Sequence, residues 1–506
     1  MVKLSSAQLT GLDATIITVE VDLSPGLHIF SIVGLADKEI QESRERIGAA
    51  VKNIGGRAPH KKAQRIIVNL APADIKKEGP AFDLPIALGF LLASEQTRFN
   101  PEGKLFLGEL GLDGSVKPIR GALASTIEAK KHSFKTIYVP KGNGNEAALV
   151  GGIEVKEVGS ILELLDDLEN KKEIAAHIRE EKAGEDIIFS NFSLIKGQEH
   201  AKRALEIAAA GGHNLLMQGP PGTGKTILAR SLPEILPKLS YEETIEVTKI
   251  YSATGFLKAS DEAVIKRPFR SPHHTASPVS IAGGGNPMRP GEITLAHRGV
   301  LFLDELPEFQ SNVLEALREP LEERVITVSR AQGTVAFPAH IILVGAMNPC
   351  PCGHLNNPPH ECVCTPGQIT KYQRKISGPL LDRIDLFIEV PPVEIKKIDE
   401  EHQETNEAEA ARQRVKKARG IQRERFLNEK LLTNSEMGLR EIKKYCPLNE
   451  ETKKILRQAY EQYAMSVRSY YRTIKTARTI ADLAESQNIE TPHLLEALQY
   501  RARVEI

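Results

Sequence analysis

The chain has 506 residues, enough for about three domains of ordinary size. Its 66 basic residues are balanced by 66 acidic residues, which excludes a uniformly basic nucleic-acid coat protein and a protein dominated by an acidic tail. No apolar run reaches the roughly 18 residues that a membrane span needs. The first ten residues do not form an apolar signal segment, so we expect a cytoplasmic protein.

The order of patterns along the chain predicts an α/β protein with a helical C-terminal part. Residues 1–165 alternate strand-like and helix-like patterns, with strands predicted over 14–23, 28–35, 65–72 and 135–140 and a helix over 38–55. Residues 166–187 are highly charged and lack large apolar faces, so we interpret them as a linker. A second α/β block follows over 188–392, and a third block, 393–506, shows only helical patterns.

The second block contains a phosphate-binding loop. The pattern G-x-x-x-x-G-K-[ST] follows a short apolar strand at 215–217 and precedes a predicted helix that starts near Lys225. Glycines in such a loop let successive backbone N–H groups point at a phosphate, and the helix N-terminus adds partial positive charge. We expect Lys225 to reach the β- and γ-phosphates of ATP and the Thr226 hydroxyl to bind Mg²⁺. The predicted ATP-binding residues of the loop are Gly219, Pro220, Pro221, Gly222, Thr223, Gly224, Lys225 and Thr226.

Two later predicted strands end in polar residues that suit the same chemistry. The run 299–309 has four apolar residues followed by Asp304 and Glu305, as expected for a buried parallel strand with an acidic pair at its end. We expect Asp304 to hold Mg²⁺ through water and Glu305 to activate the attacking water as a general base. The strand within 340–350 leads to Asn348, which could orient that water. A turn asparagine is the alternative, because Asn-Pro is a common turn signal.

Five segments, in the same order along the chain, resemble AAA+ ATPases and more closely the magnesium-chelatase-like ComM/YifB family. They are residues 197–226, 301–309, 345–353, 378–391 and 466–483. The resemblance implies an ATP- and Mg²⁺-dependent AAA+ core with a C-terminal helical lid. It also implies a homo-oligomeric, hexameric ring that acts as a helicase and drives DNA branch migration during recombination or natural transformation.

The family pattern gives roles to three polar residues. Asn348 matches the sensor 1 position, and Arg468 matches the sensor 2 arginine of the helical lid. Arg383 matches the arginine finger that reaches the γ-phosphate held by a neighbouring subunit. From the residues alone, an ion pair with Asp382 or Asp385 is the alternative for Arg383, and a solvated cationic helix face is the alternative for Arg468.

Two stretches, 263–291 and 324–360, contain no acidic residue in a chain that has 66 of them. The first resembles the helix-2 insert shared by magnesium chelatases and MCM helicases. Residues 324–340 predict a β-hairpin that corresponds to the pre-sensor-1 hairpin of the same clade. Such loops fit a ring pore that holds a phosphate backbone, although ordinary loop composition is the alternative. The residues predicted to contact DNA are Lys266, Arg267, Arg270, Arg289 and Arg330.

Four of the five cysteines form two C-x-C pairs separated by nine residues, namely Cys350, Cys352, Cys362 and Cys364. Four thiolates can close a tetrahedral zinc site. Two-residue spacers are the commoner arrangement, and four reduced thiols in a loop are the alternative. His354 and His360 are additional candidate ligands. Because the loop follows Asn348 directly, a zinc-stiffened tip could contact DNA.

Residues 63–88 and 107–123 resemble the proteolytic domain of Lon proteases, which uses a serine nucleophile and a lysine base. The serine position corresponds to Ala81 here, and the lysine position falls at or near Leu123. Neither side chain can perform this chemistry. The resemblance therefore implies a non-proteolytic domain with a ribosomal-protein-like fold that can bind nucleic acid.

Together these features predict an ATP-hydrolysing ring motor that acts on DNA. The first alternative is the ATPase subunit of a metal chelatase, against which the N-terminal domain and the cysteine-rich loop argue. The second is a protein remodeller or protease regulator. Such a motor needs aromatic pore residues to grip a peptide, and Phe269 is the only Phe, Tyr or Trp within 263–291.

Overall fold

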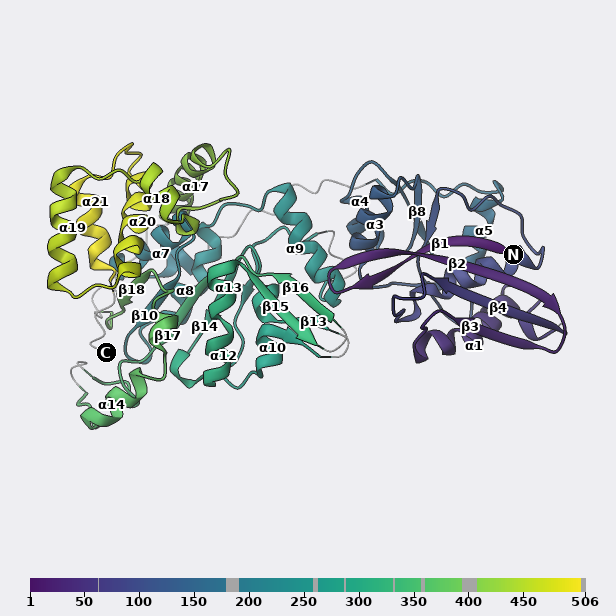
Figure 1. Cartoon of the computed structure of the whole chain (residues 1–506), viewed down its shortest axis with the longest axis horizontal. Coiled ribbons are helices and arrows are strands. Elements are labelled where there is room, and N and C mark those ends of the chain that lie inside the picture. Colours follow the sequence, from purple (N-terminus) through teal and green to yellow (C-terminus); the bar gives the residue numbers. More distant parts are fainter. Residues whose placement is uncertain are drawn as a thin grey trace. The chain divides into compact units, whose positions relative to one another are not determined.

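The computed structural model describes residues 1–61, 63–178, 191–257, 263–285, 288–330, 333–355, 360–393 and 407–501. By its internal contacts the chain divides into two compact units, whose elements are labelled in Figure 1. Unit 1 consists of Met1–Gly184 and Ser240–Ile265, and unit 2 consists of Glu185–Leu239 and Lys266–Ile506. The segment Ser240–Ile265, which the sequence patterns place in the second α/β block, therefore belongs with the N-terminal residues.

Unit 1 is built on a seven-stranded mixed sheet, so the predicted α/β character of the N-terminal block is confirmed. The alternation of apolar residues on the second strand buries Ile17, Val19 and Val21 on one face, as a period of two requires. In spatial order the strands are β3 (Ile29–Val33), β4 (Gln64–Ala71), β2 (Asp13–Pro25), β1 (Val2–Thr10), β5 (Lys104–Phe106), β8 (Thr136–Pro140) and β9 (Glu154–Val158). The α-helices in the described part of residues 1–178 are α1 (Lys38–Asn53), α2 (Asp83–Ala93), α3 (Ala122–Lys131), α4 (Gly144–Ala148) and α5 (Ile161–Leu168).

The helix α9 (Tyr241–Thr254) completes unit 1 although it comes from the later part of the chain. It contacts α3, and the Ser252 hydroxyl accepts a hydrogen bond of 3.1 Å from the backbone N–H of Gly121. Burial raises the pKa of Glu146, whose carboxylate is also hydrogen-bonded by Ser252 and Asn143. The polar contacts show that α9 fills a specific place in this unit.

The predicted linker 166–187 begins inside unit 1. The helix α5 extends to Leu168, and the backbone N–H of Ile174 donates to Asp167 at 2.6 Å. The backbone N–H of His177 donates to Val155 on β9 at 2.7 Å. The remainder of the predicted linker, from residue 179, lies outside the described residues.

The core of unit 2 is a five-stranded sheet in which all neighbouring strands are parallel. In spatial order the strands are β11 (Phe269–Arg270), β14 (Val300–Leu303), β17 (Ile342–Met347), β10 (Leu215–Gln218) and β18 (Leu386–Glu389). Every residue of β14 and β17 is buried, as expected for a parallel sheet that is covered on both faces. Gln218 pairs with Met347, so the carboxyl ends of β10 and β17 lie side by side. Parallel sheets bind ligands at this edge.

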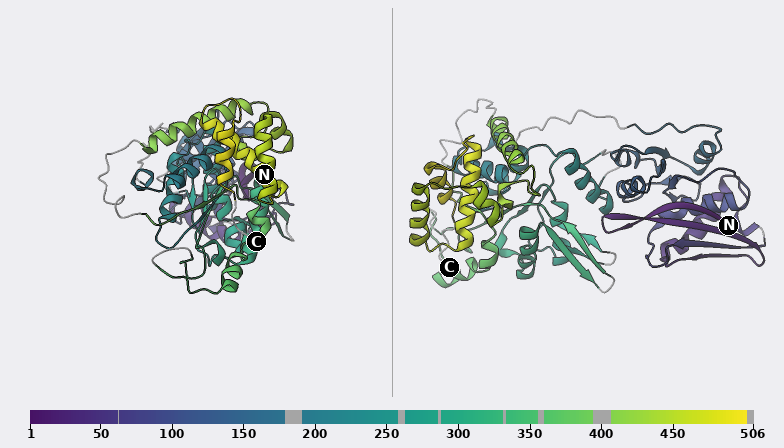
Figure 2. Two further views of the ribbon diagram at one scale, coloured as in Figure 1. Left: turned by 90° about the vertical axis from the view of Figure 1, so that its left-hand side faces the viewer. Right: turned by 45° about the horizontal axis from the view of Figure 1, so that its top comes forward.

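Helices and a hairpin surround this sheet. The predicted hairpin within 324–340 is confirmed as β15 (Val325–Arg330) and β16 (Gly333–Pro338), an antiparallel pair that is separate from the central sheet (Figure 2). The insert that follows β11 contains α10 (Pro278–Ala282), β12 (Gly283–Gly284), β13 (Arg289–Pro290) and α11 (Glu292–Leu295). The remaining core helices used below are α7 (Glu199–Gly211), α8 (Lys225–Ile235), α12 (Ser311–Ala316), α13 (Arg318–Glu323), α14 (Pro366–Gln373) and α15 (Gly378–Leu381).

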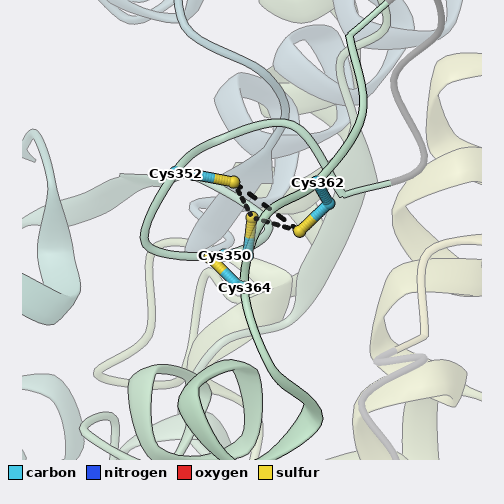
Figure 3. A group of neighbouring side chains, drawn as sticks. All are labelled: Cys350, Cys352, Cys362 and Cys364. Atoms are coloured by element: carbon cyan, nitrogen blue, oxygen red, sulfur yellow. Dashed lines mark hydrogen bonds between the residues drawn. The ribbon is translucent and has the colours of Figure 1, made fainter.

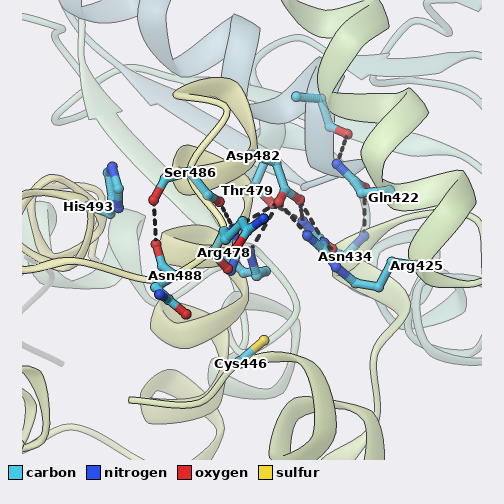
Figure 4. Close-up of polar contacts among 12 residues, drawn as sticks. Gln422, Arg425, Asn434, Cys446, Arg478, Thr479, Asp482, Ser486, Asn488 and His493 are labelled. Carbon is cyan, nitrogen blue, oxygen red and sulfur yellow. Dashed lines mark hydrogen bonds and ion pairs between the residues drawn. The ribbon is translucent and has the colours of Figure 1, made fainter. Parts of the chain in front are cut away.

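The C-terminal part, as described from residue 407, is helical as predicted. It consists of α17 (Glu407–Arg425), α18 (Leu439–Tyr445), α19 (Glu450–Gln462), α20 (Val467–Leu483) and α21 (Thr491–Gln499), with a short 3-10 turn before α18. Its interior holds a polar network around Asp482, which is fully buried and accepts hydrogen bonds from Arg425 at 2.7 Å, Asn434 at 2.8 Å and Arg478 at 3.1 Å (Figure 4). Arg478 is thus an internal residue of this helical part and not part of a solvated cationic face. None of the helices in the described ranges is both long and apolar enough to cross a membrane.

Candidate nucleotide-binding site

The phosphate-binding loop joins β10 to α8, in the predicted strand–loop–helix context. Gly222 and Gly224 have φ values of 78° and 88°, a region that glycine adopts without steric cost. At Gly219 the reason for glycine is different, because a Cβ atom would lie 2.3 Å from the carbonyl oxygen of Val390. The helix α8 starts at Lys225, so its free backbone N–H groups point into the loop.

Lys225 is only 8% exposed, and its ammonium group is held by the loop itself. It donates to the carbonyl oxygens of Gly219 at 2.7 Å and Pro220 at 2.8 Å, and to Asn348 Oδ1 at 3.3 Å. Burial lowers the pKa of Lys225, and the nearby carboxylates of Asp304 and Glu305 oppose that shift. The structure therefore brings together the predicted phosphate-binding lysine and the predicted sensor 1 asparagine from two adjacent strands.

Thr226 and Asp304 form a pair of oxygen ligands suited to Mg²⁺. The Thr226 hydroxyl donates to Asp304 Oδ2 at 2.9 Å, so the two side chains converge from the start of α8 and the end of β14. Hydroxyl and carboxylate oxygens are ligands that Mg²⁺ prefers, and the ion usually takes one or two such groups together with phosphate oxygens. The residues present therefore fit the ion that the sequence predicts.

Glu305 has an unusual backbone conformation for a residue with a side chain. Its φ and ψ angles of 50° and 47° lie in the left-handed region, which costs about 1–3 kcal/mol for a residue other than glycine. The turn points the carboxylate outward, where its side chain is 54% exposed. Strain of this kind persists where the surrounding structure fixes the chain, as at catalytic positions.

The structure adds His274, which the sequence analysis does not single out as a partner of the acidic pair. His274 Nδ1 lies 3.4 Å from Glu305 Oε2, and its ring has an edge-to-face contact with Phe309. The ring of the neighbouring His273 packs against that of His274 in a tilted arrangement, with ring centroids 4.1 Å apart. The histidine pair follows β11 by three residues, so only the placement of β11 beside β14 reveals the contact.

Arg383 and Arg468 meet at one acidic residue of the same chain. Arg383 forms an ion pair with Glu322 on α13 and also donates to the carbonyl oxygen of Pro379 at 2.7 Å. Arg468, near the start of α20, lies 3.6 Å from the other carboxylate oxygen of Glu322. The two arginines predicted to sense nucleotide therefore share one partner, and Arg383 contacts Glu322 and Pro379 on the same chain and not the phosphate-binding loop.

His213 and Asn214, which precede β10, fix the backbone around Arg383, although no motif identifies them. Asn214 donates from its side chain to the carbonyl oxygen of Arg383 at 2.8 Å and accepts from the backbone N–H of Leu343 at 2.9 Å. His213 lies 3.5 Å from Asp385, and a hydrogen bond of 2.8 Å joins it to Thr479 on α20. Burial raises the pKa of Asp385, but the His213 contact together with the charges of Arg472 and Lys475 outweighs it, and the net shift is downward.

The five residues predicted to contact DNA divide into three groups. Arg267 donates to the carbonyl oxygens of Pro237 at 2.6 Å and Arg298 at 2.7 Å, and Arg270 forms a two-bond ion pair with Glu292 at 2.6 and 2.7 Å. These two arginines anchor the insert to the core. Lys266 and Arg289 are exposed, whereas the side chain of Arg330 lies outside the described residues.

The two C-x-C pairs come together in space (Figure 3). The four sulfur atoms of Cys350, Cys352, Cys362 and Cys364 all lie within 4.8 Å of one another. The Cys350 sulfur is 3.3 Å from that of Cys352 and 3.6 Å from that of Cys362. The backbone N–H of His354 bonds to the Cys352 sulfur and lowers its pKa to about 6. The rings of His354 and His360 contact each other in a tilted arrangement, with ring centroids 4.9 Å apart.

Three family models match successive parts of the chain. Residues 191–398 match the family described as magnesium chelatase, subunit ChlI, and residues 405–501 match its C-terminal family. Residues 19–143 match a family described as subunit ChlI of Mg-chelatase. The N-terminal domain therefore matches a family that is itself described as a chelatase subunit. Contrary to the expectation from the sequence, the presence of this domain does not by itself argue against a chelatase subunit.

Comparison with curated proteins gives relatives over the whole length. The chain is 42% identical to the competence protein ComM of Haemophilus influenzae over 98% of this chain and 96% of the relative. It is 42% identical to the protein YifB of Escherichia coli over 97% of this chain and 95% of the relative. A 67 kDa magnesium-chelatase subunit of Heliobacterium mobile is 26% identical over 45% of this chain and 37% of the relative. With its matching core, phosphate-binding loop and helical C-terminal part, the chain belongs to the ComM/YifB family of magnesium-chelatase-like AAA+ ATPases.

Proposed function

We propose that this chain is the subunit of a hexameric, ATP-driven ring in the cytoplasm that moves DNA, and that it drives branch migration during recombination or natural transformation. The full-length relationship to a relative named as a competence protein supports the link to transformation. The acid-free insert and hairpin support contact with a phosphate backbone.

In the proposed reaction the residues around the phosphate-binding loop have separate tasks. Lys225 exchanges its two carbonyl partners for phosphate oxygens of ATP, and Asn348 stays beside it to orient the attacking water. Glu305 accepts the proton of that water. Thr226 and Asp304 hold Mg²⁺, which when bound neutralises charge on the β- and γ-phosphates.

The observation that best supports assembly into a ring is the position of Arg383. Its guanidinium contacts Glu322 and Pro379, and within the described residues its buried Nε atom has no hydrogen-bond partner. Once its terminal nitrogens exchange Glu322 and Pro379 for phosphate oxygens, the planar guanidinium suits two-bond recognition of phosphate. We therefore assign Arg383, with Arg468 beside it, to the ATP held by the neighbouring subunit. Under this assignment no subunit completes its own site, so hydrolysis requires assembly.

For DNA contact we retain the exposed Lys266 and Arg289 of the insert, and Arg330 at the end of β15. Arg267 and Arg270 are assigned to anchoring, because their guanidinium groups bond to the core and to Glu292. The insert also contains His274, which contacts Glu305. If DNA binding shifts the insert, His274 would move relative to Glu305.

The test is ATP hydrolysis by the purified protein without DNA and with single-stranded, duplex, forked and four-way-junction DNA, followed by strand movement on the junction. We expect DNA to stimulate hydrolysis and ATP to drive exchange of the junction arms. Glu305→Gln serves as the inactive control that keeps the shape of the side chain. Hydrolysis that no DNA alters, with no movement of arms, would contradict the proposal.

The ATPase subunit of a metal chelatase is the second candidate, because the chelatase family models and the partial match to the 67 kDa subunit favour it. A chelatase subunit is expected to hydrolyse ATP without stimulation by DNA. The same DNA series therefore separates the two candidates.

A further inference from the structure

We propose that Cys350, Cys352, Cys362 and Cys364 bind one zinc ion, and that this ion holds the cysteine-rich loop against the phosphate-binding loop. The metal would thus support ATP hydrolysis, in addition to any contact between the loop and DNA. The inference rests on the nucleotide site alone and not on the proposed action on DNA.

The first step is the fit of the thiols to zinc. Four sulfur atoms about 2.3 Å from a tetrahedral zinc ion lie about 3.8 Å apart from one another. The closest observed separations among the four cysteines are 3.3 and 3.6 Å, and none exceeds 4.8 Å. Small movements of the side chains are therefore enough to place one ion at equal distance from all four sulfur atoms. A tetrahedral set of four thiolates selects zinc or iron, and the closed set without an open position is typical of structural zinc.

The second step is the contact between the two loops. Gly353 directly follows Cys352 and has a φ value of 82°. A Cβ atom at Gly353 would lie 2.7 and 2.8 Å from the ring atoms Cδ and Cγ of Pro221, which belongs to the phosphate-binding loop. The backbone of the cysteine-rich loop therefore touches that loop, and only glycine allows this approach.

The third step is the anchoring of Asn348 at the other end of the loop. Asn348 and Pro349 separate β17 from Cys350, and α14 begins two residues after Cys364. Gln373 on α14 donates to the carbonyl oxygen of Pro349 at 3.2 Å, and the backbone of Asn348 is hydrogen-bonded to Tyr372. Closing the four thiols on one ion ties the segment after Asn348 to the segment before α14. One metal ion would then fix the position of both Gly353 and Asn348, the two residues through which the loop contacts the nucleotide site.

The direct test is metal analysis of the full chain purified without chelators or added metal. We expect close to one zinc per chain in the wild type and in Cys446→Ala, which removes the buried thiol of the helical part, and a loss of zinc in the double variant Cys350→Ser, Cys364→Ser. Cobalt(II) exchanged into the wild type should give the absorption bands of a tetrahedral thiolate site even if the double variant fails to fold. Protein without metal, or with iron in place of zinc, would overturn the assignment.

The coupling is tested separately with Gly353→Ala. This variant keeps all four thiols but adds a methyl group at the contact with Pro221, so we expect zinc content to stay and ATP turnover to fall. Displacement of catalytic groups by about 1 Å can cost up to about a hundredfold in rate, and we expect a fall of about tenfold or more. Normal turnover by Gly353→Ala, or by a folded, zinc-free cysteine variant, would overturn the coupling and leave the nucleotide site and the DNA proposal intact.

Discussion

His274 Nδ1 lies 3.4 Å from Glu305 Oε2, so a histidine of the insert touches the carboxylate to which we assign the role of general base. Glu305 is exposed and its backbone is already fixed in the left-handed region, which leaves the side-chain rotamer as its main freedom. A partner that holds one rotamer can therefore control when the carboxylate meets water.

We predict that His274→Ala raises ATP hydrolysis in the absence of DNA and reduces the stimulation by DNA. A partly exposed side-chain contact contributes about 1 kcal/mol or less, so the increase should be at most about fivefold. The measurement is steady-state turnover with and without single-stranded DNA. His273→Ala is the comparison variant, because it removes the ring beside His274 and the contact with Thr275 while the His274 side chain that meets Glu305 is kept. Unchanged turnover under both conditions would remove His274 from the proposed control.

Lys225→Ala and Glu305→Gln should fail at different steps. Lys225→Ala removes the ammonium group that would exchange its carbonyl partners for phosphate, so we expect nucleotide binding to be lost. Glu305→Gln keeps the volume of the side chain but not its basicity, so we expect ATP to bind and to remain unhydrolysed. Binding of a fluorescent ATP analogue and phosphate release measure the two steps. Wild-type turnover in Glu305→Gln would place the general base elsewhere.

Arg383→Ala should bind ATP and hydrolyse it on the order of a thousandfold more slowly, since arginine fingers contribute at least that much in other NTPases. Mixing Arg383→Ala subunits with Lys225→Ala subunits should restore part of the hydrolysis. At some interfaces an intact phosphate-binding loop then faces an intact finger. A mixture that co-assembles but is no more active than its components would contradict a site shared between subunits.

Asp482→Asn should destabilise the C-terminal helical part. Asp482 is fully buried and is the common acceptor of Arg425 and Arg478, so removing its charge leaves one buried and one half-buried guanidinium group without this counterion. Breaking a buried ion pair typically costs about 3–5 kcal/mol. Thermal unfolding and hydrogen exchange over residues 439–499 measure the effect. Glu450→Gln is the control, because its ion pair with Lys453 is exposed and should leave the stability almost unchanged.

The parts of the site that the sequence predicts are those whose geometry is local. The turn from β10 into α8 requires glycines and a lysine at fixed spacing, and the acidic pair directly follows the apolar strand β14. Both features can therefore be predicted from a few consecutive residues. Charge counting is less informative for the insert. Counting charges predicts the same DNA-binding role for Arg270 and Arg289. In the structure Arg270 is bonded to Glu292, whereas Arg289 is exposed.

Contacts between distant segments are the parts that the sequence does not predict. Asn214 and Glu322 contact Arg383, and His213 contacts the nearby Asp385. These three residues lie far from Arg383 in the sequence, and each is an ordinary polar residue in its own neighbourhood. The same holds for the assignment of α9 to unit 1. Its contacts with Gly121 and Glu146 join residues that are more than 100 positions apart in the sequence.

The assignment of α9 to unit 1 also determines when unit 1 can complete its folding during synthesis of the chain. The ribosome makes the phosphate-binding loop and α8 before it makes Ser240–Ile265, so the first unit stays incomplete until nucleotide-site residues of the second have emerged. A fragment that ends at residue 178 would leave the buried carboxylate of Glu146 without its Ser252 partner. An isolated N-terminal domain for binding studies should therefore be made with the α9 segment fused to its end.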